Sequence, residues 1–385
     1  MDEQFAIDVI SGRHRGVIPA ALRTVCHVAS WGYAAGMTLR NAAYDSGWWR
    51  SHGVDIPVIS VGNITTGGTG KTPIVAWITH QLQARGRRPG ILSRGYRSLD
   101  KTSFLPCTTG SASALTTSQG DKTLAKPVAH NAANDEAMVL AQLCPGVPQV
   151  AMRDRVAGAA IAIQQHGCDA LVLDDAFQHR RLARDLDLVL IDATQPWGFG
   201  HLLPRGLLRE PLSALKRADA VIITRADQVD AATITDLRHT VARVRGVDEH
   251  IAVRFAPQRL INTLGEKKSP THLVSRKTIA FCGIGNPDGF RHTLRDLGLN
   301  AELRAFPDHH HYTAADLDRL AEWRQQHDAA ALITTMKDLV KIPETHSLAE
   351  HIWAVDIAPE FLAGEEHMLR RLDGILPQRA IRQAA

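Results

Sequence analysis

The sequence predicts an α/β fold built around a doubly wound parallel sheet, and two observations support this prediction. Apolar runs of strand length alternate with segments whose apolar residues recur at helical spacing. A loop rich in glycine and threonine joins the first run, residues 57–62, to the first helical segment. Alternation of this kind places parallel strands at the centre and helices on both faces.

The remaining elements follow in the same alternating order. Strands are expected at residues 88–93, 147–151, 168–173, 186–192, 220–224, 330–335 and 352–355, helices at 135–143 and 154–165, and a strand, glycine turn and helix start at 278–287. Residues 257–277 are polar and weakly patterned, which indicates a linker or crossover. We therefore expect three regions: an N-terminal helical region at 1–56, a phosphate-binding core at 57–256, and a smaller α/β lobe at 257–385.

Composition excludes several classes of protein. With 385 residues, 44% of them hydrophobic and 22% charged, the chain is expected to fold around a real core. The five cysteines are scattered, so neither a zinc site nor a disulfide framework is indicated, and a reducing compartment fits best. A net charge of +4 is too small a bias to indicate a nucleic-acid partner, and the N-terminus lacks a secretory signal pattern.

The N-terminal region combines aromatic and basic residues. No charged residue occurs between Arg23 and Arg40, but this stretch is too short and too polar to span a bilayer, which takes about 20 mainly apolar residues. Trp31, Trp48 and Trp49 lie in or beside it. The pattern suits a helix at a membrane interface, and it suits equally well an ordinary helix packed on the core.

The strongest local signal is the segment VGNITTGGTGKTP, residues 61–73. A strand, a glycine loop and a helix in this order form a phosphate-binding loop, so the core is expected to be P-loop NTPase-like. The residues expected to bind the nucleotide are Thr65, Thr66, Gly67, Gly68, Thr69, Gly70, Lys71 and Thr72. Lys71 would reach the terminal phosphates and Thr72 would bind Mg²⁺. Thr65 stands where the usual pattern has glycine; the alternative is a structural turn.

Two carboxylates follow the apolar strand at residues 168–173. Because the carboxyl ends of parallel strands meet at one edge of a sheet, Asp174 and Asp175 are expected near the phosphates, where a carboxylate can hold Mg²⁺. Successive strand residues point to opposite sides, so we assign Asp174 to the metal and Asp175 to the metal or the substrate. The alternative for the pair is a surface turn.

Further polar groups lie at the ends of other elements. Asp135 begins a helix, where it could cap the helix or deprotonate an acceptor. Three consecutive histidines, residues 309–311, cannot all face one point, so they favour orientation of a carboxylate over a zinc site. Lys337 and Asp338 follow a strand, with anion binding and surface charge both open. Residues 224–227, TRAD, occupy the position where related nucleoside triphosphatases hold the base, but without the Asn and Lys of a guanine site.

Eight motifs occur in an order that resembles the lipid A tetraacyldisaccharide 4′-kinase family. They are VGNITTGGTGKTP, LSRGYR, NDEA, LDDAFQHRRL, LLPRGLLREP, FCGIGNP, FPDHHHY and TTMKDLVK, and the resemblance runs from about residue 15 to residue 356. The chain departs from the family pattern at Asn134, Ala137 and Ala176. Residues 99–133 are weakly patterned and are expected to form a loop or hairpin near the site.

The resemblance implies a function and roles for residues. It implies a kinase that uses ATP and Mg²⁺ to phosphorylate the 4′-hydroxyl of a lipid-linked tetraacyl disaccharide 1-phosphate, as a peripheral (monotopic) protein at the cytoplasmic face of the bacterial inner membrane. No nucleic acid and no obligate protein partner are implied. Asp135 matches the catalytic base, His309 its partner, and Asp174 and Asp175 the acidic pair near Mg²⁺, while Lys71 belongs to the phosphate loop.

Two other classes of protein remain as alternatives. One is a switch ATPase of the partitioning or metallochaperone type, although such loops carry a lysine where this chain has Thr66. The other is a nucleotide-binding membrane scaffold without catalytic activity, which the intact Lys71, Asp174 and Asp135 disfavour.

Overall fold

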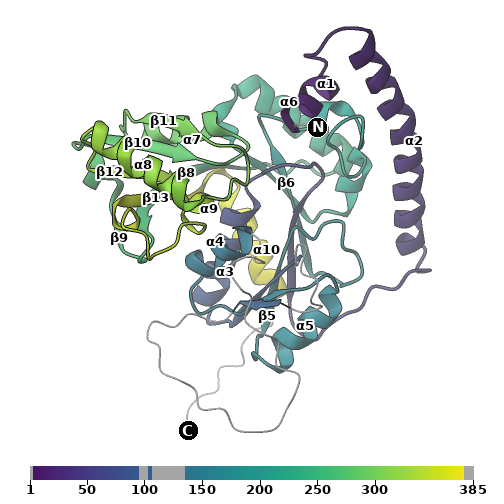
Figure 1. Cartoon of the computed structure of the whole chain (residues 1–385). Helices are drawn as coiled ribbons and strands as arrows, with labels where there is room; N and C mark the ends of the chain where they lie inside the picture. Colours follow the sequence, from purple (N-terminus) through teal and green to yellow (C-terminus); the bar gives the residue numbers. More distant parts are fainter. Residues whose placement is uncertain (1–2, 95–102, 106–134, 377–385) are drawn as a thin grey trace, which may run out of the picture.

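The computed structural model describes residues 3–94, 103–105 and 135–376, and within them one 13-stranded sheet runs through the molecule (Figure 1). Across the sheet the strands follow the order β11 (Glu302–Ala305), β10 (Thr278–Cys282), β12 (Ala331–Thr335), β13 (Ile352–Ala363), β8 (Ile251–Asn262), β7 (Ala220–Thr224), β6 (Leu186–Asp192), β1 (Val58–Asn63), β5 (Ala170–Asp174), β2 (Pro89–Ser93), β4 (Gln149–Ala151) and β3 (Ser103–Leu105). The short β9 (Lys267–Lys268) pairs with β8. The predicted loop or hairpin at residues 99–133 falls almost wholly outside the described residues.

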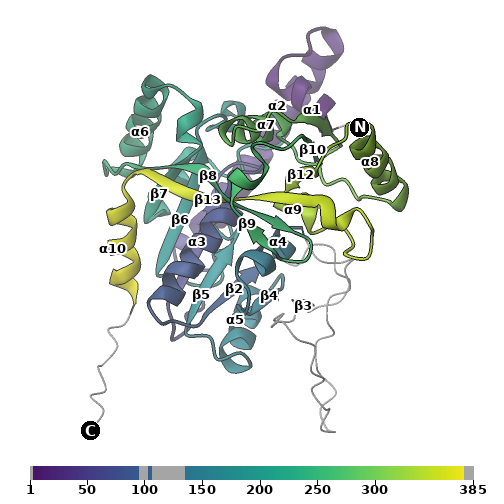
Figure 2. The ribbon, with the colours of Figure 1, turned by 90° about the vertical axis from the view of Figure 1, so that its left-hand side faces the viewer.

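Helices cover both faces of this sheet. The helices of the described residues are α1 (Glu3–Ser11), α2 (Val17–Asp45), α3 (Lys71–Ala84), α4 (Asp135–Leu143), α5 (Arg155–Gln164), α6 (Ala231–Arg245), α7 (Pro287–Asp296), α8 (Ala314–Gln326), α9 (Met336–Leu339) and α10 (Glu365–Ile375), of which α1 and α2 lie beside the sheet. Side chains of α3, α4, α8 and α10 share one hydrophobic cluster, and Figure 2 shows α3 and α10 on the same side of the sheet. Helices α5, α6 and α7 pack in separate clusters.

The predicted doubly wound parallel sheet is confirmed. Strands β1, β2, β5, β6 and β7 pair in parallel, and every residue in them is buried. Full burial on both faces explains why these strands are continuous apolar runs in the sequence. We refer to this half, with α3–α6, as the core, and to β10–β13 with α7–α9 as the C-terminal lobe.

The prediction of a linker or crossover at residues 257–277 is wrong for residues 257–262, which belong to a strand. Strand β8 runs from Ile251 to Asn262 and pairs antiparallel with β13 over almost its whole length. The two ends of β8 are buried, but the middle is partly exposed, so the apolar pattern that marks a strand is interrupted. The domain boundary that we predict at residue 256 lies inside β8, and the division into three regions stays a prediction.

The strand that precedes the phosphate loop is fixed by a close backbone approach. A Cβ atom on Gly62 would lie 2.6 Å from both the Cβ and the backbone nitrogen of Phe177, so only glycine fits there. Phe177 is fully buried and belongs to the turn that follows the acidic pair. The end of β1 and this turn are therefore held against each other.

The N-terminal region forms α1 and the long helix α2, which lies along one side of the molecule (Figure 1). Its inner face is held by polar contacts: the Tyr33 hydroxyl donates to the carbonyl of Arg209 at 2.9 Å, and Asn41 donates to Glu210 at 2.8 Å. Neither α2 nor any other helix in the described ranges is both long and apolar enough to span a bilayer.

Candidate active site

The phosphate loop connects β1 to α3, and its backbone depends on two glycines. Gly67 and Gly70 have φ values of 109° and 83°, in the region that favours glycine. A Cβ atom on Gly70 would also lie 2.2 Å from the ring of Phe255, a residue of β8. Lys71 is the first residue of α3, so the loop ends at a helix N-terminus, which is suited to bind phosphate.

The non-glycine start of the loop has a structural explanation. Thr65 is buried and forms an isolated β-bridge with Leu208, and the Thr66 N–H donates to the Leu207 carbonyl at 2.8 Å. Thr65 has no positive φ, so this position does not require glycine. The departure from the usual pattern therefore leaves the loop intact.

The acidic pair lies beside the loop, and its two carboxylates differ in their surroundings. Asp174 pairs in register with Val61 of β1, is 7% exposed, and its Oδ1 atom has no hydrogen-bond partner. Burial raises the pKa of Asp174 to about 6. A buried carboxylate oxygen without a partner is costly unless a cation or a donor occupies the adjacent space.

Asp175, in contrast, is bound by two cations. Its carboxylate accepts from Arg209 Nη1 at 2.8 and 2.9 Å, and Lys71 Nζ lies 3.4 Å away. Burial by itself would raise the pKa of Asp175, but Lys71 and Arg209 outweigh burial and lower it. Sequence reasoning missed Arg209, although it belongs to the quoted motif LLPRGLLREP.

The donor set can be tested for Mg²⁺. Among the described residues, no group of three His, Cys, Asp or Glu side chains converges on a metal site. A Mg²⁺ ion bound with nucleotide needs only one or two carboxylates, because phosphate oxygens and water complete its shell. The unpartnered, buried oxygen of Asp174 fits that requirement.

A second group of contacts joins the core to the C-terminal lobe. Asp135 begins α4 in the core, and His309 lies in the loop after β11; the distance from His309 Nδ1 to Asp135 Oδ2 is 3.0 Å. The Nζ atom of Lys341, in the turn after α9, lies 2.9 Å from the same oxygen. Next to this pair, Lys337 Nζ lies 2.9 Å from Glu136 Oε1.

These contacts set the charge of the pair. Burial alone would raise the pKa of Asp135, but His309 and Lys341 lower it below its ordinary value. Contact with Asp135 raises the pKa of His309. Asp135 is therefore ionised at neutral pH and can accept a proton, while His309 is favoured in its charged form.

His309 and His310 differ in backbone conformation and in the groups that they contact. His309 has a φ of 55°, a strained value for a residue other than glycine, and its N–H lies 3.2 Å from the Gly283 carbonyl and 3.0 Å from Asp308 Oδ1. His310 turns away, stacks on Phe306 and contacts Asp316 at 3.2 Å. Of the two, only His309 reaches Asp135.

Asp338 is buried. The sequence left open that Lys337 and Asp338 are a charged pair on the surface, and for Asp338 this alternative is wrong. Its side chain is fully buried, and its Oδ1 accepts from the Gly283 N–H at 3.1 Å and from the Tyr312 hydroxyl at 3.0 Å. Thr335 donates to Oδ2 at 2.7 Å. Asp338 therefore ties the start of α9 to the loops that surround His309.

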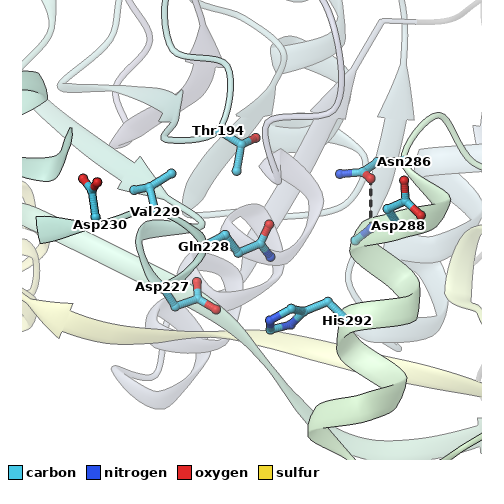
Figure 3. Close-up of a pocket in the computed structure, with 9 residues that line it drawn as sticks. Thr194, Asp227, Gln228, Val229, Asp230, Asn286, Asp288 and His292 are labelled. Atoms are coloured by element: carbon cyan, nitrogen blue, oxygen red, sulfur yellow. Dashed lines mark hydrogen bonds between the residues drawn. The ribbon is translucent and has the colours of Figure 1, made fainter.

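A cavity of about 540 Å³ lies between the core and the C-terminal lobe, at the carboxyl end of β7 (Figure 3). Its lining side chains are mostly polar: Thr194, Asp227, Gln228, Val229 and Asp230 on the core side, and Asn286, Asp288 and His292 on the side of α7. Nearby, Arg225 forms an ion pair with Asp192 and donates to the Gly68 carbonyl at 2.8 Å. The cavity is therefore linked to the phosphate loop.

Comparison with known proteins agrees with this geometry. Residues 22–376 match the model of the family described as tetraacyldisaccharide-1-P 4′-kinase. The chain belongs to this family. A tetraacyldisaccharide 4′-kinase of Anaeromyxobacter sp. (strain Fw109-5) is 40% identical over 89% of each chain, and one of Chlorobaculum parvum is 36% identical over 91% of this chain and 94% of its own.

A solved structure gives the same result. The crystal structure of LpxK from Aquifex aeolicus in complex with ATP superposes with a TM-score of 0.69 at 28% identity, covering 92% of this chain and all of that one. The chain is an ATP-dependent kinase of lipid A biosynthesis that acts on the 4′ position of a tetraacyl disaccharide 1-phosphate.

Proposed function

We propose that Asp135 is the general base of this kinase and that His309 orients it across the two parts of the molecule. The 3.0 Å contact between His309 and Asp135 carries this proposal. Through this contact a residue of the C-terminal lobe fixes the orientation of an ionised carboxylate in the core. Asp135 takes the proton of the 4′-hydroxyl, the hydroxyl oxygen bonds to the γ-phosphorus, and the bond to the β–γ bridging oxygen breaks to leave ADP.

The phosphate loop supplies the positive surroundings for this transfer. Backbone N–H groups between Gly67 and Thr72 surround the phosphates, since the Thr66 N–H is bound to the Leu207 carbonyl, and Lys71 reaches the β- and γ-phosphates. In the chain alone, Lys71 faces Asp175 at 3.4 Å, while Arg209 lies closer to the same carboxylate. Arg209 can therefore neutralise Asp175 when Lys71 turns to the phosphates.

We assign Thr72 and Asp174 to Mg²⁺, with Asp175 beside them. The unpartnered Oδ1 of Asp174 supports this assignment. When bound, Mg²⁺ would supply positive charge that offsets the negative charge developing in the transfer.

The order of strands in the sheet supports a position for the nucleoside end of ATP. Strand β5, with the acidic pair, lies on one side of β1, and β6 and β7 lie on the other. If the terminal phosphate and Mg²⁺ face the acidic pair, the nucleoside extends over the ends of β6 and β7. The polar cavity is there, and Asp227 in it can accept a hydrogen bond from the adenine amine or the ribose.

The exposed face of α2 supports peripheral binding to a membrane surface, which we assign to the cytoplasmic face of the inner membrane. Val25, Val28, Trp31 and Leu39 are each more than half exposed on it. An apolar face of this kind on a helix beside basic residues binds at the level of lipid headgroups. The opposite face of α2 contacts the segment that carries Arg209, so lipid binding would orient the site towards an acyl-anchored substrate.

Replacement of the base tests the catalytic proposal. Asp135→Ala is expected to lower turnover by about 10² or more, at nearly unchanged affinity for ATP, since the variant loses proton transfer but keeps the phosphate loop. The measurement is transfer of ³²P from γ-labelled ATP to tetraacyl disaccharide 1-phosphate in detergent micelles. Asp236→Ala, at an exposed position of α6, serves as the control. Wild-type turnover in Asp135→Ala would remove Asp135 from this role.

The position of the nucleoside is tested by the affinity for ATP. Asp227→Ala is expected to weaken ATP binding by roughly 10- to 150-fold, because one hydrogen bond to a charged group is worth roughly 1.5–3 kcal/mol. Binding of inorganic triphosphate should be unaffected, and both are measured by calorimetry. Asp236→Ala, an exposed position on α6, is the matched control. Equal losses for ATP and triphosphate would place the nucleoside elsewhere.

The membrane proposal is tested by flotation with vesicles that contain anionic phospholipid. Val25→Asp places a charge on the exposed face of α2 and is expected to reduce the bound fraction, since burying a charge at an interface is costly. Val247→Asp, at an exposed apolar position of the core, is the control. Equal flotation of Val25→Asp and wild type would show that α2 does not mediate binding.

A further inference from the structure

Lys341 is a buried cation with no role in the transfer described above. Its side chain is 6% exposed, and its Nζ lies 2.9 Å from Asp135 Oδ2 and 3.8 Å from Asp338 Oδ1. The Lys341 N–H donates to the Asp338 carbonyl at 3.0 Å, so the turn that carries the side chain is itself fixed. A lysine is seldom buried to this degree without a specific partner.

Both cations at Asp135 bind the same oxygen. His309 Nδ1 lies 3.0 Å and Lys341 Nζ 2.9 Å from Oδ2. No hydrogen bond from another described residue reaches Oδ1. A carboxylate that is held through one oxygen presents the other in a fixed direction, with its lone pairs available to a hydroxyl.

We propose that Lys341 is a positioning residue for phosphoryl transfer: together with His309 it holds Oδ2 of Asp135, so that Oδ1 is the atom that receives the proton of the acceptor hydroxyl. The proposal rests on the proposed role of Asp135 as the base. Lys341 acts through Asp135 and touches neither ATP nor the disaccharide. It also links the base to the C-terminal lobe independently of the histidine.

The charge of Lys341 also affects the pKa of Asp135, which an uncharged side chain of the same shape would not do. The charged groups around Asp135 are His309 from the loop after β11, Lys341 from the turn after α9, and the neighbouring pair of Glu136 and Lys337. Burial alone would raise the pKa of Asp135, and His309 and Lys341 oppose it. Without Lys341, less opposes the effect of burial, so the pKa of Asp135 rises. The carboxylate is then protonated at a higher pH than in the wild type, and the variant loses its base as the pH falls.

Lys337 provides a matched control within the same structure. It comes from α9, crosses to α4 like Lys341, and pairs with the adjacent carboxylate Glu136 at 2.9 Å. Its replacement removes an ion pair between α4 and the same part of the C-terminal lobe without removing a contact of Asp135 Oδ2. Comparison of the two lysines therefore separates an effect on the base from a general effect on packing of the lobe.

The test is the pH dependence of turnover, measured as ³²P transfer to the tetraacyl disaccharide 1-phosphate, for the whole chain and its variants. Lys341→Met is expected to reduce turnover about tenfold or more at acid pH, because the fall of turnover on the acid side of the profile, its acid limb, moves to higher pH. Part of this loss should be regained at alkaline pH, where Asp135 is ionised again. Lys341→Arg should keep the wild-type limb, because it keeps the charge. Lys337→Met should shift the limb less than Lys341→Met does, because Lys337 pairs with Glu136 and makes no contact with Asp135 Oδ2, and the affinity for ATP should be the same in all variants.

Two results would overturn the proposal: an unchanged profile for Lys341→Met, or a loss by the same factor at every pH. If Lys341→Met does not fold, as judged by circular dichroism and ATP binding, Lys341→Gln removes the charge with a smaller change of polarity and carries the same expectation. Asp135→Asn in the same assay separates the two claims. Wild-type turnover in that variant would refute the base itself, whereas its inactivity beside an unshifted Lys341→Met would refute only the role of the lysine.

Discussion

The antiparallel pairing of β8 with β13 is the contact on which the active site depends. It joins the parallel strands of the core to those of the C-terminal lobe in one sheet, although the two strands are far apart in the chain. Phe255 of β8 also packs against Gly70 in the phosphate loop, and β13 is followed by α10, which packs against β6 and β8 in the core. The joint therefore contacts the loop directly and determines where the C-terminal lobe can present His309.

Around this joint, the carboxylates fall into distinct electrostatic environments. Burial of Asp174 outweighs the attraction of Lys71 and raises the pKa of this carboxylate to about 6, whereas Asp175 and Asp135 are each held by two cations that lower their pKa. Groups that lie side by side but differ in this way can serve different steps. The arrangement separates a position for a metal from a position for a base, which is what transfer of a phosphoryl group to an alcohol requires.

Much of the core could be predicted from the sequence because its signals are local. The strands at residues 186–192 and 220–224 are continuous apolar runs, and the phosphate loop and acidic pair each lie within one short segment. The resemblance to a family was needed to connect Asp135 with His309, since no periodicity links residues of different lobes. Strand β8 was missed because its exposed middle breaks the apolar pattern. Arg209 and Lys341 were missed because their partners are distant in sequence, and only the folded chain brings them to Asp175 and Asp135.

The central claim is that Asp135 and His309 act as one unit across the two parts of the molecule. A double-mutant cycle tests it directly, with ³²P transfer to the lipid disaccharide measured for Asp135→Asn, His309→Ala and the double variant. Residues that act as a unit are strongly non-additive, so the double variant is expected to be about as slow as the slower single variant. A double variant whose loss equals the product of the two single losses would contradict the account, because it would mean that the two groups contribute independently.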